Sequence, residues 1–136
     1  MKISGPKQIW QILFYLFLLT LVLVGCRRGN SDDISGINVD LTVSPDPPAV
    51  GLATIKLVLS DADDQPLSGA VVELEGNMNH AGMVPVFSQA TETDPGQYEA
   101  PLEFTMGGDW FVLVKVSLPD GREFERQVNL PGVETR

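Results

Sequence analysis

Cysteine and histidine are nearly absent from this sequence, which has one of each among 136 residues. A single cysteine excludes a disulfide framework within the chain and a cysteine-based zinc site. Basic residues are also scarce, because nine Lys and Arg stand against eighteen Asp and Glu, for a formal net charge of −9. A nucleic-acid binder needs the opposite balance to neutralise phosphates, so we expect no nucleic-acid partner.

Catalytic motifs are missing as well. The sequence has no Gly-x-Ser-x-Gly elbow, no phosphate-cradling glycine loop and no second histidine for a metallohydrolase. Glu73 and Glu75 are two residues apart, which places both on the exposed face of an alternating strand. The acidic run at 61–64 lacks the following glycine and the distal glutamate of an EF-hand loop, which favours a hairpin turn over a calcium site. We therefore expect that the chain is not an enzyme.

The first 25 residues have the pattern of a secretory signal peptide. Lys2 and Lys7 precede an apolar run, Ile12–Val24, that is short for a membrane-spanning helix. The run ends in Leu-Val-Gly-Cys at 23–26, which resembles a bacterial lipobox, and Cys26 supplies the thiol that lipidation requires. We expect a lipid anchor on Cys26 that attaches the protein to a membrane.

The alternative is an uncleaved signal anchor followed by Arg27 and Arg28. Both hypotheses predict an extracytoplasmic protein. A lipoprotein would lie at the outer membrane or periplasm of a Gram-negative cell, or on the outer face of a Gram-positive cell membrane. The predicted organisation is a signal peptide at 1–25, the lipidated cysteine with a flexible tether at 26–36, a folded domain at 37–131, and a tail at 132–136.

From residue 37 onward the hydrophobic period is two, which indicates β-strands. Proline, glycine and aspartate mark the turns between apolar segments. We predict an all-β, immunoglobulin-like antiparallel sandwich that is monomeric. Its seven strands are expected at 37–43, 53–59, 70–74, 83–88, 97–104, 109–118 and 123–130.

Tyr98 follows an Asp94-x-Gly96 turn at the spacing of a tyrosine corner, in which the phenol bonds to backbone at a sheet-to-sheet turn. Pro101 predicts an edge strand or a position outside the hydrogen-bond ladder. Because no disulfide is available, the core must be held by packing alone. Its largest expected members are Phe104, Trp110, Phe111 and Phe124.

The segment 76–82 does not have the pattern of a strand. Met78, His80 and Met83 lie in or next to it, and Met106 lies in a second Gly-rich loop. Thioether sulfur and imidazole nitrogen suit Cu(I) better than calcium or magnesium, so these four residues are candidate metal ligands. In the structural alternative, the methionines fill gaps at the rim of the sandwich and His80 is an ordinary loop residue.

Five sequence segments occur in the order found in one known family. They are SPDPPAVG at 44–51, DADDQPLSGA at 61–70, MNHAGM at 78–83, DPGQYEA at 94–100 and FTMGGDW at 104–110. The chain thereby resembles the YtkA-like domain, which is related to the periplasmic part of FixH-type proteins. The resemblance implies an immunoglobulin-like sandwich in the bacterial envelope, associated with copper and heavy-metal handling. Met78, His80 and Met83 match the family's Met/His-rich segment, while Met106 and Trp110 match its Met-Gly-x-Trp segment.

Two functions follow from these observations. In the first, a lipid-anchored envelope protein binds or relays Cu(I) and exchanges it with a metal-transport system. In the second, the sandwich is an interaction module that offers a strand edge, such as the strand containing Pro101, to an envelope protein.

Overall fold

A computed structural model describes residues 34–135. The predictions for the signal peptide, for Cys26 and for most of the tether concern residues outside this range. Seven strands form in the described part: β1 (Asn38–Ser44), β2 (Gly51–Ser60), β3 (Val71–Met78), β4 (Val86–Asp94), β5 (Gln97–Phe104), β6 (Gly108–Ser117) and β7 (Glu123–Val133). No helix in residues 34–135 is long and apolar enough to cross a membrane.

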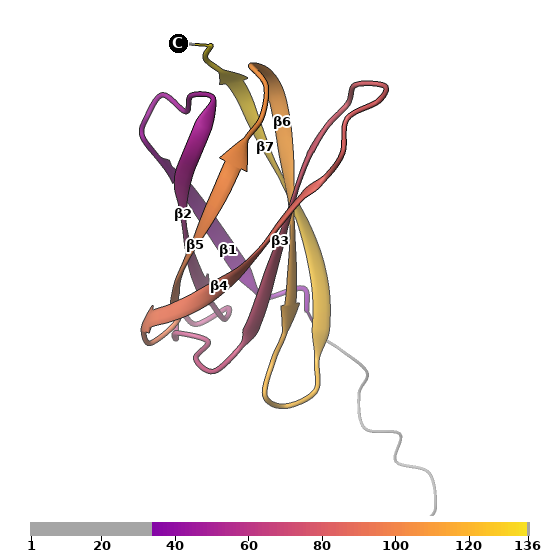
Figure 1. Cartoon of the computed structure of the whole chain (residues 1–136). Coiled ribbons are helices and arrows are strands. Elements are labelled where there is room, and N and C mark those ends of the chain that lie inside the picture. The colour runs from indigo at the N-terminus through magenta and orange to yellow at the C-terminus, as the bar shows by residue number, and fades with distance from the viewer. Residues whose placement is uncertain (1–33, 136) are drawn as a thin grey trace, which may run out of the picture. The chain divides into compact units, whose positions relative to one another are not determined.

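The strands are antiparallel in the order β1-β2-β5-β4-β3-β6-β7. β4 joins the two layers, because its first half, from Val86 to Ala90, pairs with β3 and its second half pairs with β5. Figure 1 shows β4 crossing from the layer of β1, β2 and β5 to the layer of β3, β6 and β7. The predicted all-β sandwich of seven strands is therefore confirmed.

Alternation along the strands builds the core between the layers. On β2, Ile55, Leu57 and Leu59 are buried while the residues between them are exposed. β5 and β6 repeat this pattern, and two of their buried rings, Phe104 and Trp110, meet edge to face with centroids 5.1 Å apart. Phe124 is also buried, as predicted.

Phe111 was predicted to lie in the core, and this is wrong. Side chains of a strand alternate between faces, so Phe111 points away from the face that carries its neighbour Trp110. Trp110 is 2% exposed, whereas Phe111 is half-exposed on the outer face of β6. The apolar residues on both faces of β6 concealed this alternation in the sequence.

The strand boundaries also differ from the prediction at the β3–β4 hairpin. Gly76 to Met78 continue β3, although the sequence predicted that this strand ends at Leu74. Gly76 pairs with Val112 and with Val86, and a Cβ there would lie 3.3 Å from a methyl carbon of Leu102. The glycine therefore serves close packing within the strand rather than ending it.

The ends of β4 and β7 also differ from the prediction, whereas Pro101 agrees with it in lacking a partner on one side. β4 begins at Val86, so that Met83 precedes it, and it continues to Asp94. β7 extends to Val133, which is buried, two residues beyond the predicted domain end. β5 lies between β2 and β4 in the sheet order, but only its residues up to Glu99 pair with β4. Pro101 pairs with Thr54 on the other side and has no partner on β4.

Tyr98 makes the contacts that its spacing predicts. Its hydroxyl donates to the carbonyl oxygen of Leu67 (2.7 Å) and accepts from the amide of Ala70 (3.0 Å). Both partners lie in the β2–β3 connection, where the chain passes from one layer to the other. The turn before Tyr98 joins β4 and β5, so the phenol stabilises a different connection from the one it follows.

Candidate functional site

The four candidate ligands lie on or next to two connections at one end of the sandwich. Met78 is the last residue of β3, and His80 and Met83 belong to the β3–β4 hairpin. Met106 lies between β5 and β6. Figure 1 shows both connections at the end of the molecule that carries the C-terminus.

Strand pairing brings Met78 next to the segment that contains Met106. Met78 pairs with Trp110 across β3 and β6. Its side chain is half-buried, and its terminal methyl carbon would lie 3.0 Å from a Cβ added at Gly108. Gly108 has a positive φ of 123°, a conformation that favours glycine, so the backbone leaves room for this thioether.

Trp110 connects the buried core with the loop that carries Met106. Its indole Nε1 donates to the backbone oxygen of Met106 over 2.9 Å. This bond satisfies the buried indole donor and holds the backbone of Met106 four residues upstream. The side chain of Met106 is 40% exposed, so its thioether is accessible beside a fixed backbone.

His80 and Met83 are positioned by a turn. The amide of Met83 donates to the carbonyl oxygen of His80 over 3.4 Å, so both residues lie at the start and end of one tight turn. Met83 is half-buried against the core cluster, whereas His80 is exposed. The imidazole Nδ1 lies 3.0 Å from the carbonyl oxygen of Ala81. In the tautomer that donates this bond, Nε2 carries the lone pair that a metal needs.

The donor set agrees chemically with a soft metal such as Cu(I). Three thioethers and one neutral imidazole are the ligand types that a monovalent, soft ion accepts. Met78 pairs with Trp110, whose indole contacts the backbone of Met106, and His80 and Met83 share one turn. Among residues 34–135, no three His, Cys, Asp or Glu side chains are grouped so as to hold a metal.

The acidic residues considered for calcium form an ordinary turn. One carboxylate oxygen of Asp61 accepts from the amides of Asp63 and Gln65, each over 2.9 Å. Asp64 has a positive φ of 58°, a conformation that aspartate tolerates in turns. The local hydrogen bonds of Asp61 therefore account for the acidic residues at 61–64 through turn formation.

Sequence reasoning missed a second feature, a depression on the outer face of β6 and β7. It is lined in part by Phe111, Gln127 and Asn129, and it reaches the β3–β4 hairpin at Asn79. Strict alternation counted from Trp110 would have placed Phe111 on this outer face. The amide side chains of Gln127 and Asn129, on the next predicted strand, would then have been expected beside Phe111.

Comparison with known proteins identifies the family. The model of the YtkA-like family matches residues 31–115, which is more than half of the chain, and the chain belongs to this family. No curated protein matches it. It is similar to the soluble domain of PmoD from Methylocystis sp., with a TM-score of 0.47 and 15% identity over 72% of this chain and 90% of that one. It is also similar to murine CRIg, with a TM-score of 0.42 and 15% identity over 73% of this chain and 98% of that one.

Proposed function

We propose that this protein is an extracytoplasmic, lipid-anchored YtkA-like protein that binds Cu(I) through Met78, His80, Met83 and Met106. The observation that supports the proposal is the β3–β6 pairing, which brings two methionines from separate segments to one end of the sandwich. Sequence neighbours alone would provide three donors, Met78, His80 and Met83. Met106, from a second segment, raises the number of candidate donors to four.

The proposed chemistry is binding without catalysis. Cu(I) accepts low coordination numbers, and thioethers hold it more weakly than thiolates do. The side chains of Met106 and His80 are accessible to solvent, so an ion bound there could exchange with a metal-transport partner. Met78 and Met83 pack against the core and would provide the fixed part of the site.

The test is competition for Cu(I) against a chromophoric chelator, with the full chain purified in detergent. The variant combines Met78→Leu, Met83→Leu and Met106→Leu with His80→Gln. Leucine keeps the apolar volume of methionine and removes the sulfur, so the fold should be retained. Asn79→Ala on the same hairpin is the matched control, because this residue contributes no soft donor. Equal folded content is checked by circular dichroism.

We expect one Cu(I) per chain in the wild type and in the control. The fourfold variant should bind at least about tenfold more weakly. If the wild type does not compete with the chelator, or if the variant competes as well as the wild type, the copper proposal is wrong.

The second candidate function is a module that binds an envelope protein through a strand edge. It is supported by the divergence of β4 from β5 after Glu99, which leaves the segment at 100–104 paired with β2 alone. A photoreactive side chain at Glu103 should then crosslink one discrete protein in cell membranes. The same probe at Asp40 on β1 should not give that adduct. Equal labelling from both positions would contradict this function.

A further inference from the structure

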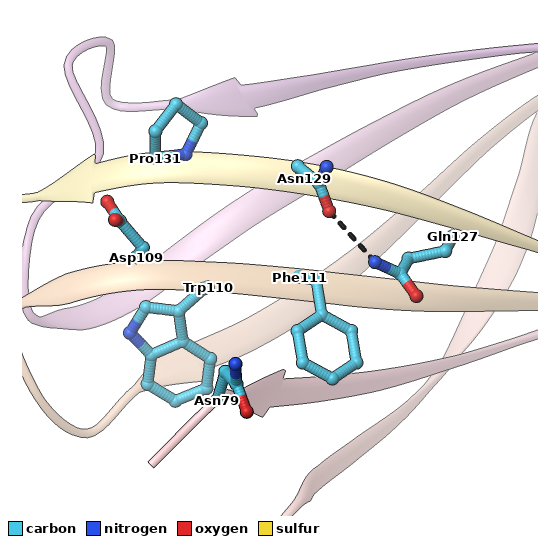
Figure 2. Close-up of a pocket in the computed structure, with 7 residues that line it drawn as sticks. All are labelled: Asn79, Asp109, Trp110, Phe111, Gln127, Asn129 and Pro131. Carbon is cyan, nitrogen blue, oxygen red and sulfur yellow. Dashed lines mark hydrogen bonds between the residues drawn. The ribbon is translucent and has the colours of Figure 1, made fainter.

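The depression on the outer face of β6 and β7 has a volume of about 610 Å³. That size falls within the range of small-molecule sites in proteins. Figure 2 shows Phe111 between Asn79 and Gln127, with Asn129 on the neighbouring strand β7. Asp109 lines the same depression nearer to the end of the sandwich. None of the Cu(I) ligands proposed above lines it.

The polar lining consists mainly of carboxamides. Nε2 of Gln127 donates to Oδ1 of Asn129 over 3.0 Å, which orients both groups. Asn129 keeps its Nδ2 donor and Gln127 keeps its Oε1 acceptor for a ligand. The side chain of Asn79 makes no hydrogen bond within residues 34–135. Each amide thus offers a hydrogen-bond donor, an acceptor or both, and the hydroxyl group of a ligand can pair with either.

Phe111 provides an apolar surface in the middle of these amides. It pairs with Asn77 of β3 and with Asn129 of β7, so polar side chains flank it on both neighbouring strands. The ring is half-exposed although the core lies directly behind its strand. The face of an aromatic ring carries partial negative charge and attracts C–H groups that carry partial positive charge.

The charge of the depression restricts the class of ligand. No lysine or arginine lines it, and Asp109 is its single ionisable lining residue. One oxygen of Asp109 accepts from the amide of Gly132 over 3.0 Å, which leaves the second oxygen as an acceptor. A phosphate or carboxylate ligand would be repelled. A purely apolar ligand would bury the amides without hydrogen bonds.

We propose that this depression binds a neutral oligosaccharide. Sugar rings combine a C–H face, which would lie on Phe111, with hydroxyl groups, which would exchange hydrogen bonds with Asn79, Gln127 and Asn129. Asp109 would accept from a further hydroxyl group. The proposal uses none of the proposed Cu(I) ligands, although Asn79 lies between Met78 and His80 on the same hairpin.

The test is a nuclear magnetic resonance titration of the isotope-labelled full chain. The detergent must have a phosphocholine head group, since a sugar head group would compete. The probes are cellotetraose, maltotetraose and the tetramer of N-acetylglucosamine, with a tetramer of galacturonate as the anionic comparison. At least one neutral tetramer should shift the side-chain amide signals of Asn79, Gln127 and Asn129 saturably, and the anionic tetramer should not.

Variants show whether the ring and the amides act as argued. Phe111→Ala should weaken binding at least about tenfold, because it removes the apolar surface. Phe87→Ala is the matched control, since Phe87 is 68% exposed on β4 and lies outside the depression. Its affinity should stay within about twofold of the wild type. Asn129→Asp, which keeps the shape and changes the donor, should also weaken binding.

Two results would overturn the proposal. The first is that no neutral tetramer shifts these amide signals at about 10 mM, where even a millimolar affinity would be visible. The second is that Phe111→Ala and Phe87→Ala weaken binding equally, which would indicate nonspecific contact with exposed rings. Circular dichroism of each variant confirms that the sandwich is intact, so loss of fold cannot be mistaken for loss of the site.

Discussion

The hydroxyl of Tyr98 holds the β2–β3 connection, and its removal should measurably destabilise the sandwich. Tyr98→Phe keeps the buried ring, which is 1% exposed, and deletes only the hydroxyl. The carbonyl oxygen of Leu67 and the amide of Ala70 then lose a partner at 2.7 and 3.0 Å. The substitution therefore removes these two hydrogen bonds, and the interaction of the hydroxyl with Glu92, without changing the packing of the ring.

The magnitude follows from the burial of the two partners. A hydrogen bond contributes about 0.5–1.5 kcal/mol net, and a buried group left unpaired costs about 1–3 kcal/mol. Leu67 and Ala70 are half-buried, so water can partly replace the hydroxyl. We expect a loss of about 2 kcal/mol, which at an ordinary urea dependence lowers the unfolding midpoint by about 1 M.

The assay is urea unfolding followed by Trp fluorescence and by circular dichroism. Thr93→Val is the control, because it removes an exposed hydroxyl whose bond to the carbonyl oxygen of Gln97 is 3.4 Å long. It should cost less than about 0.5 kcal/mol. A loss for Tyr98→Phe no larger than this control value would refute the reasoning, since the phenol would then not stabilise the connection.

Three further predictions concern titration and packing. Backbone amides of Gly96 and Gly69 donate to the Glu92 carboxylate and hold its pKa below the ordinary 4.5. The ionised carboxylate therefore stabilises the folded protein above that value, and this contribution is lost as the pH falls through the folded-state pKa. Urea midpoints measured against pH should therefore fall less steeply in acid for Glu92→Gln; equal slopes would contradict this. Burial raises the pKa of Tyr98 above 10.0. The wild type should therefore lose stability relative to Tyr98→Phe as the pH rises through the folded-state pKa. A constant difference in stability between the two proteins up to that pH would disprove this prediction. Gly76→Ala, whose Cβ would lie 3.3 Å from Leu102 and 3.5 Å from Trp110, should cost about 1 kcal/mol in the same urea assay, and a more stable variant would show that the strand has room there.

The strands and turns were largely predictable because their signals are local. Alternation along β2 and β5 identified their buried faces, and the Asp-Pro-Gly turn at 94–96 marked the hairpin that joins β4 and β5. The fold class and the family followed from these patterns and from the order of the motifs. The hydrogen bonds of Tyr98 also followed from its spacing after the turn, although their partners lie in a more distant connection.

Local sequence patterns gave wrong predictions at residues whose role depends on contacts with another strand. Gly76 has the appearance of a strand end, yet its missing side chain admits Leu102 and Trp110 at the centre of the sandwich. Phe111 has the large apolar side chain that is typical of a core residue. It lies on the outer face because it alternates with its neighbour Trp110, which points into the core. In both cases apolar or small residues occur on both faces, so the period of two is hidden.

For the candidate sites, the sequence by itself determined the chemistry and the structure decided the grouping. The residue types of Met78, His80, Met83 and Met106 already indicate a soft metal, because donor softness is a property of the side chain alone. That they lie at one end of the sandwich depends on the β3–β6 register, which pairs Met78 with Trp110. The depression around Phe111 likewise exists only once β6 and β7 pair, because strand pairing brings together side chains from different parts of the chain.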